Sequence, residues 1–109
     1  MEFRILGPLE VEDDGRTIPL AGAKQRSLLA LLVLARGRTV STDRLIDEIW
    51  DGAPPETALK NVQVYVSHLR TALGDGRIVR RERGYELRVA PGELDADRFD
   101  EIVRSASGV

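Results

Sequence analysis

Apolar residues recur with the period of a helix in three consecutive stretches of this chain, and that order restricts the folds open to it. In the first stretch Leu28, Leu31, Leu32 and Ala35 are spaced as on one face of a helix, and Gly37 is a suitable stop. Segments with strand-like alternation lie before and after the three stretches. The pattern predicts an α+β fold in which three helices stand between an N-terminal antiparallel sheet and a C-terminal hairpin.

The second and third predicted helices are separated by a short loop, residues 51–56, that contains two prolines. The second begins at Ser41 or Thr42, either of which can cap it, and Asp43 in its first turn suits the helix dipole. The third is expected to begin near Glu56 or Thr57. The stripes expected to be buried are Leu45, Ile46, Ile49 and Trp50 on the second helix, and Leu59, Val62, Val66, Leu69 and Leu73 on the third.

The flanking segments have the alternation of strands. Residues 3–12 alternate apart from the turn residues Gly7 and Pro8, and residues 16–20 return as a second strand after a turn. Residues 78–89 are typical of a hairpin, and its tip carries Arg80, Arg81 and Arg83. A small antiparallel sheet and a basic hairpin are therefore expected on the two sides of the helices.

A further helix is expected after Pro91 and Gly92, where Phe99, Ile102 and Val103 fall on one side. Its apolar stripe has no partner helix in the remaining residues. Either it packs back on the domain or it begins a further module, and we favour the second interpretation.

Composition excludes several classes of protein. Without cysteine the chain has no disulfide framework and no thiolate metal site, and with one histidine it has no metal-ligand cluster or catalytic triad. No glycine-rich phosphate loop is present, so neither an enzyme nor a cofactor is expected. The longest apolar run, about eight residues, is far below the roughly 20 that span a bilayer. The N-terminus lacks the pattern of a secretory signal, so a cytoplasmic protein without membrane contact is expected.

Charge is distributed unevenly along the chain. The net charge is −2, yet residues 57–88 hold seven basic and only three acidic side chains. The third predicted helix has no acidic residue between Ala58 and Leu73. An outward face without carboxylates, followed by an arginine-rich hairpin, is the arrangement that a polyanion requires.

The order of helix, turn, helix and basic hairpin predicts a winged helix-turn-helix that binds double-stranded DNA. The third helix would enter the major groove, and the hairpin would reach an adjacent minor groove, where narrow A·T-rich stretches attract arginine. Each element alone has a simpler interpretation: a solvated helix face, a charged hairpin edge, or a packed Tyr65. Their occurrence together, flanked by acidic segments, favours DNA.

Residues 3–89 also resemble the OmpR/PhoB-type winged-helix domain, and most closely the version in SARP-type and AfsR-like activators of actinobacteria. The resemblance is carried by FRILGPLEV, AKQRSLLALLVL, STDRLIDEIWDGAPPETALKNVQVYVSHLRTALG and RGYELRV. It implies a DNA-binding domain over residues 1–90. Residues 91–109 resemble a linker and the first helix of the bacterial transcriptional activation domain that follows in such regulators.

The resemblance also implies functional residues and partners. DNA contacts are expected on the recognition helix, about 57–73, a backbone phosphate contact from Tyr65, and a minor-groove contact from Arg81. The helix positions are Lys60, Asn61, Gln63, Ser67, His68 and Arg70. Relatives usually have arginine where this chain has His68, and a shorter, mostly neutral imidazole does not favour a bidentate contact with guanine. The alternatives for His68 are a phosphate contact or simple solvent exposure, and a lone histidine is not expected to bind a metal or to act in catalysis.

The resemblance further implies binding to direct repeats as a head-to-tail dimer. RNA polymerase holoenzyme would be recruited through the loop that contains Asp51, Gly52 and Glu56, which on its residues alone is equally typical of a helix-linking turn. Two other functions remain open: a winged helix that docks a partner protein, and the output domain of a two-component response regulator. The second is disfavoured because the sheet begins at Met1 and no receiver domain precedes it.

Overall fold

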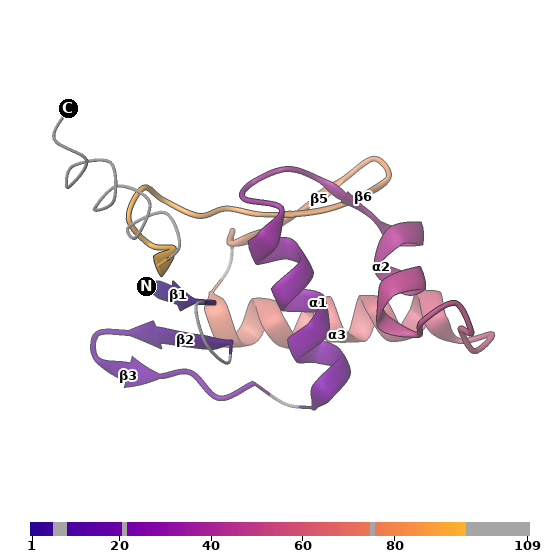
Figure 1. Ribbon diagram of the computed structural model, residues 1–109, viewed down its shortest axis with the longest axis horizontal. Helices are drawn as coiled ribbons and strands as arrows, with labels where there is room; N and C mark the ends of the chain where they lie inside the picture. Colours follow the sequence, from indigo (N-terminus) through magenta and orange to yellow (C-terminus); the bar gives the residue numbers. More distant parts are fainter. Residues whose placement is uncertain (6–8, 21, 75, 96–109) are drawn as a thin grey trace, which may run out of the picture. The chain divides into compact units, whose positions relative to one another are not determined.

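The computed structural model describes residues 1–5, 9–20, 22–74 and 76–95, and Figure 1 shows its helices and strands. The chain divides into two compact units. One comprises Met1–Pro19 together with the chain from Val89, and the other comprises Leu20–Arg88.

The first unit is built on a three-stranded antiparallel sheet of order β1-β2-β3. Phe3 pairs with Val11 in this sheet, and both side chains are fully buried. The single strand expected over residues 3–12 is therefore wrong, because residues 2–4 and residues 10–13 form two separate strands that pair antiparallel with each other. The strands are β1 (Glu2–Arg4), β2 (Glu10–Asp13) and β3 (Arg16–Thr17).

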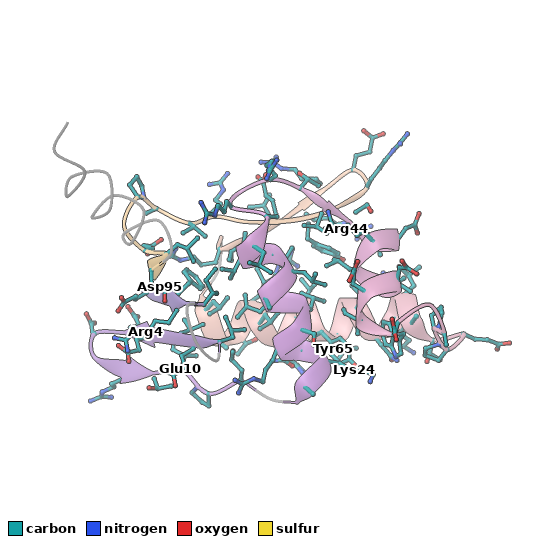
Figure 2. The ribbon with its side chains drawn as sticks, in the orientation of Figure 1. Arg4, Glu10, Lys24, Arg44, Tyr65 and Asp95 are labelled. Atoms are coloured by element: carbon teal, nitrogen blue, oxygen red, sulfur yellow. The ribbon has the colours of Figure 1, made fainter. Side chains whose placement is uncertain are left out.

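The segment after the hairpin joins this sheet at β1. The backbone N–H of Phe3 donates to Glu93 O at 2.6 Å, that of Ile5 donates to Asp95 Oδ1 at 2.9 Å, and Leu94 is buried against the strand. Arg4 and Asp95 are labelled in Figure 2. The helix expected beyond Gly92 falls almost wholly on residues 96–109, outside the described residues.

The second unit combines three helices with a three-stranded antiparallel sheet of order β4-β6-β5. In Figure 1, α1 crosses α3 and α2 lies near the N-terminal end of α3, and both helices pack on α3. Its elements are α1 (Ala23–Leu34), β4 (Val40–Ser41), α2 (Thr42–Ile49), α3 (Ala58–Leu73), β5 (Ile78–Arg81) and β6 (Gly84–Leu87).

The core of this unit is apolar and confirms the expected stripes in part. On α1, Leu28 and Leu32 are buried as expected, whereas Leu31 is only half-buried, as is Ala35 after the helix, and Leu29 and Val33 are buried in addition. On α3 the buried stripe begins at Ala58, one position before the residue expected, so that Leu59 turns outward and is 55% exposed. Ile46, Ile49 and Trp50 on and after α2 are only half-buried. The buried apolar residues are Leu28, Leu29, Leu32, Val33, Val40, Leu45, Ala58, Val62, Val66, Leu69, Leu73, Ile78, Tyr85 and Leu87.

The start of α2 is defined by a side-chain cap and by a strand. Ser41 Oγ accepts the backbone N–H of Arg44 at 3.1 Å, which confirms the expected cap. Ser41 and Val40 also form β4, which pairs with β6. The expected hairpin, β5–β6, is thus part of a three-stranded sheet, to which β4 adds the third strand. No helix in the described part of the chain is long and apolar enough to cross a membrane.

Candidate nucleic-acid interface

The outward face of α3 is a ridge of exposed residues opposite the buried stripe. At 3.6 residues per turn, its centre is formed by Lys60, Val64, Ser67 and Thr71, all exposed. Lys60 supplies the charge of this ridge, and Ser67 and Thr71 supply hydroxyl groups. Val64, 41% exposed, and Thr71 were not among the expected contacts, although their spacing from Lys60 on the helix would have indicated both.

One flank of this ridge faces the hairpin. It carries Gln63, which is exposed, and Arg70, which is half-buried. The Arg70 Nε–H donates to the carbonyl oxygen of Ile78 on β5 at 3.2 Å. Arg70 therefore ties the recognition helix to the hairpin through one nitrogen, while its two terminal amino groups bond to no other described residue.

The other flank carries Asn61, Tyr65 and His68, each of which has an intramolecular contact. Asn61 Nδ2 donates to Thr57 Oγ1 at 3.3 Å. The ring of Tyr65, labelled in Figure 2, stacks on Trp50 with centroids 6.3 Å apart and planes at 25°. The third contact joins His68 Nδ1 to Gln25 Oε1 on α1 at 3.3 Å. This flank therefore has more intramolecular side-chain contacts than the flank with Gln63 and Arg70.

The hairpin presents its arginines around a two-residue loop, Glu82–Arg83. Arg80, Arg81 and Arg83 are all exposed. Arg81 forms a salt bridge with Glu86 of β6. Because side chains alternate across a strand, Arg80 and Arg81 point to opposite faces of the hairpin. In the described part of the chain Arg80 and Arg83 have no ionic partner.

The hairpin is joined closely to β4 and to the start of α2. The backbone N–H of Thr42 donates to the carbonyl oxygen of Arg83 at 2.9 Å. Gly84 pairs with Ser41, and a Cβ atom at Gly84 would lie 1.9 Å from Val40 O. Only glycine fits this approach of two backbones. The wing arginines are thereby held at a defined place beside the helix-turn-helix.

The loop between α2 and α3 is exposed throughout residues 51–57. Asp51 has φ +50° and Gly52 φ +81°. The N–H of Gly52 donates to Asp47 O at 3.1 Å, and that of Ala58 donates to Pro55 O at 3.1 Å. The turn therefore has a defined backbone that presents Asp51 and Glu56 to solvent. Among the residues that the structure describes, no cluster of three or more potential metal ligands exists.

Comparison with protein families and curated proteins confirms the resemblance seen in the sequence. Residues 15–87 match the family described as "Transcriptional regulatory protein, C terminal". The chain is 39% identical, over 97% of its length, to regulatory protein AfsR of Streptomyces coelicolor, of which the match covers 11%. It is 37% identical, over its whole length, to transcriptional regulatory protein EmbR of Mycobacterium tuberculosis, of which the match covers 29%.

Solved structures confirm the winged-helix fold. The structure of Mycobacterium tuberculosis EmbR in complex with a low-affinity phosphopeptide aligns with a TM-score of 0.86 and 36% identity, over 90% of this chain and 27% of that one. The DNA-binding domain of Escherichia coli CadC aligns with a TM-score of 0.62 and 27% identity, over 74% of this chain and 79% of that one. The chain spans between a tenth and a third of the curated relatives AfsR and EmbR. These comparisons join it to regulators, which confirms the expectation that it is not an enzyme.

Proposed function

The chain belongs to the OmpR/PhoB-type family of transcriptional regulatory domains, in its SARP branch, and from this premise we propose that it binds double-stranded DNA sequence-specifically as part of a transcriptional activator. In this proposal α3 lies in the major groove, and the β5–β6 hairpin lies at an adjacent minor groove. The regulator would act in the cytoplasm, where its DNA is.

The observation that carries this proposal is the chemistry of one surface. The exposed ridge of α3 has no carboxylate, and the adjoining hairpin carries three exposed arginines within four residues. Such a surface satisfies the two needs of DNA recognition, which are positive charge for phosphates and uncharged donors and methyl groups for base edges. Lys60 and the wing arginines serve the first need, and Gln63, Val64 and Ser67 serve the second.

The similarity to CadC supports DNA over a protein partner, because the matched domain of CadC is a DNA-binding domain and its fold aligns with 74% of this chain. A winged helix that docks a protein is the alternative, as is the output domain of a response regulator. A docking surface for a protein is expected to expose a contiguous apolar patch. Of the large apolar side chains exposed among the described residues, Leu34 lies on α1, and Leu59 and Val64 on α3 stand beside Lys60 and Gln63.

Two finer features belong to the same proposal. Binding as a head-to-tail dimer on direct repeats follows from the family likeness. Recruitment of RNA polymerase holoenzyme is proposed for the loop with Asp51, Gly52 and Glu56, whose two carboxylates stand in solvent on an ordered turn. A basic patch on the polymerase would suit that charge.

The test is selection of duplexes from a random pool by the purified protein at two salt concentrations. Recovery of a spaced direct repeat, with affinity falling by about 0.9 log unit per log unit of salt for each phosphate contacted, is the expected result. Failure to enrich any sequence at either concentration would favour the protein-docking alternative.

A further inference from the structure

One hydrogen bond joins the proposed recognition helix to a buried polar side chain. Gln25 on α1 is 5% exposed, and among the residues that the structure describes it is the one polar residue that is buried. Its Oε1 atom lies 3.3 Å from Nδ1 of His68 on α3. His68 is itself exposed and is the single histidine of the chain. A buried amide therefore holds the one imidazole that stands beside the DNA-facing ridge.

With the carbonyl oxygen of Gln25 turned toward His68, as in this structure, the contact selects one tautomer of the imidazole. An amide oxygen can only accept a hydrogen bond, so its partner Nδ1 must be the N–H donor. A neutral imidazole has one N–H group, which leaves Nε2 with a free lone pair. Nε2 lies across the ring from Gln25, and no described residue bonds to it. The ring nitrogen of His68 that is not bonded to Gln25 is therefore a hydrogen-bond acceptor.

An acceptor that faces the major groove can pair only with a donor on a base edge. The donors there are the amino groups of adenine N6 and cytosine N4, whereas guanine and thymine present acceptors. We propose that His68 recognises an adenine or cytosine through Nε2, and that Gln25 is the positioning residue that selects this tautomer. The inference depends on the proposed DNA binding and adds a base preference to it.

The His68–Gln25 pair offers a hydrogen-bond acceptor to the base edge, where an arginine at position 68 would offer donors. A guanidinium carries donors only and pairs with guanine O6 and N7. The neutral imidazole offers an acceptor in the same place. The specificity of this chain at one base pair is thus expected to differ from that of a domain with arginine at this position, and the cause lies on α1 and not on the recognition helix alone.

The tautomer is tested first, without DNA and without any variant. Long-range proton–nitrogen NMR of the ¹⁵N-labelled protein in mildly alkaline buffer reports on the single imidazole directly. Protonated Nδ1 and unprotonated Nε2 are expected. Protonated Nε2 in the wild-type protein would overturn the inference. Gln25→Met, which keeps the side-chain length and removes the acceptor, is expected to abolish the Nδ1–H preference, and the exposed neighbour Ser27→Ala is expected to keep it.

The base preference is tested by sequence selection with the same proteins. Wild-type protein and Ser27→Ala should favour adenine or cytosine at one position of the site by about 3- to 10-fold, the value of one neutral hydrogen bond. His68→Ala and Gln25→Met should lose that preference and keep those at every other position. A general loss of specificity in Gln25→Met would assign Gln25 a structural role only.

The two tests separate the two levels of the argument. If wild-type protein enriches no sequence while NMR finds the Nδ1–H tautomer, the proposed DNA binding fails and the structural assignment of His68 stands. If a site is enriched and His68→Ala leaves every base preference unchanged, DNA binding stands and reading by His68 is refuted. A guanine or thymine preference that depends on His68 would also refute it.

Discussion

The carbonyl oxygen of Arg83 accepts the backbone N–H of Thr42 at 2.9 Å, so the tip of the hairpin is bonded to the first residue of α2. The first N–H groups of a helix have no partner within it. Ser41 satisfies one of them and the hairpin satisfies another. The wing is thus part of the cap of the helix-turn-helix, and changes in either are expected to affect both.

Gly84→Ala is expected to destabilise the protein by about 3 kcal/mol or more, because overpacking of this kind forces the backbone to move. The new Cβ would lie 1.9 Å from Val40 O and 2.8 Å from Ser41 Cα, neither of which can rotate away. Urea unfolding measures the loss. Gly76→Ala is the matched control, with φ +89° and nothing within 4 Å of a Cβ, and should cost only about 1–2 kcal/mol. Equal losses of stability in the two variants would show that the backbone of β4 can move away from the new Cβ at little cost.

Arg81→Ala is expected to weaken binding to sites with A·T-rich flanks by about 1–3 kcal/mol and to weaken binding to G·C-flanked sites less. The narrow minor groove of A·T-rich DNA favours an inserted guanidinium. Fluorescence anisotropy with the two duplexes gives both affinities. Arg16→Ala removes the same charge from the exposed strand β3 and should not discriminate between them. An equal loss on both duplexes for Arg81→Ala would reject the minor-groove role.

Tyr65→Phe separates the two interpretations of the Tyr65 side chain. The stack on Trp50 needs only the ring, so the substitution should leave stability within about 0.5 kcal/mol. If the hydroxyl contacts a phosphate, DNA affinity should fall by about 1 kcal/mol regardless of sequence. Thermal unfolding and a DNA titration measure the two effects. Unchanged affinity, together with a destabilised Tyr65→Ala, would make the residue a packing element.

Gln63→Ala and Arg70→Ala are each expected to cost about 1–3 kcal/mol of binding if the side chain reads a base. Only Arg70→Ala should also lower stability, because it removes the donor to the Ile78 carbonyl. Selection from the random pool and urea unfolding give both quantities. If both variants bind with wild-type affinity and sequence preference, the recognition face has been placed on the wrong side of α3.

Asp51→Asn combined with Glu56→Gln in the full-length regulator is expected to lower transcription about fivefold or more while DNA affinity is kept. Asparagine tolerates the positive φ of Asp51, so the turn should persist without its charge. In vitro transcription with RNA polymerase holoenzyme, next to a DNA titration, provides the measurement. Asp47→Asn on the exposed side of α2 is the control. If transcription is undiminished, the loop does not recruit RNA polymerase through these carboxylates and only connects α2 with α3.

The periodic parts of the fold could be predicted from the sequence, and the parts fixed by long-range pairing could not. The helices and the hairpin follow from spacing alone, because burial of one face imposes a period on the chain. Strand β4 has only two residues, too few to show any period. The sequence predicts a buried Leu59, but the buried stripe of α3 begins at Ala58. Alanine is small and gives only a weak apolar signal, so this start cannot be recognised from the pattern.

The site was predictable in composition and not in its contacts. The lack of acidic residues on α3 and the run of arginines on the hairpin are visible in the sequence, and the structure has the helix and the hairpin at these residues. The bonds from His68 to Gln25 and from Arg70 to Ile78 join positions with no local pattern between them. Such contacts exist only once the helices have packed, so sequence reasoning left the role of His68 open.

The contact of β1 with residues 93–95 has a consequence for how the chain is made. Ile5 and Asp95, which bond to each other, are 90 residues apart, whereas the sheet beside the helices joins Val40 to Tyr85. On a ribosome that adds roughly 5–20 residues per second, the first strand leaves the exit tunnel about 5–20 s before its last partner. All residues of the helical unit leave the tunnel first, so a nascent chain paused when Arg88 has emerged and residues 93–95 are still inside is expected to hold a folded wing and an N-terminal sheet without the partner of β1.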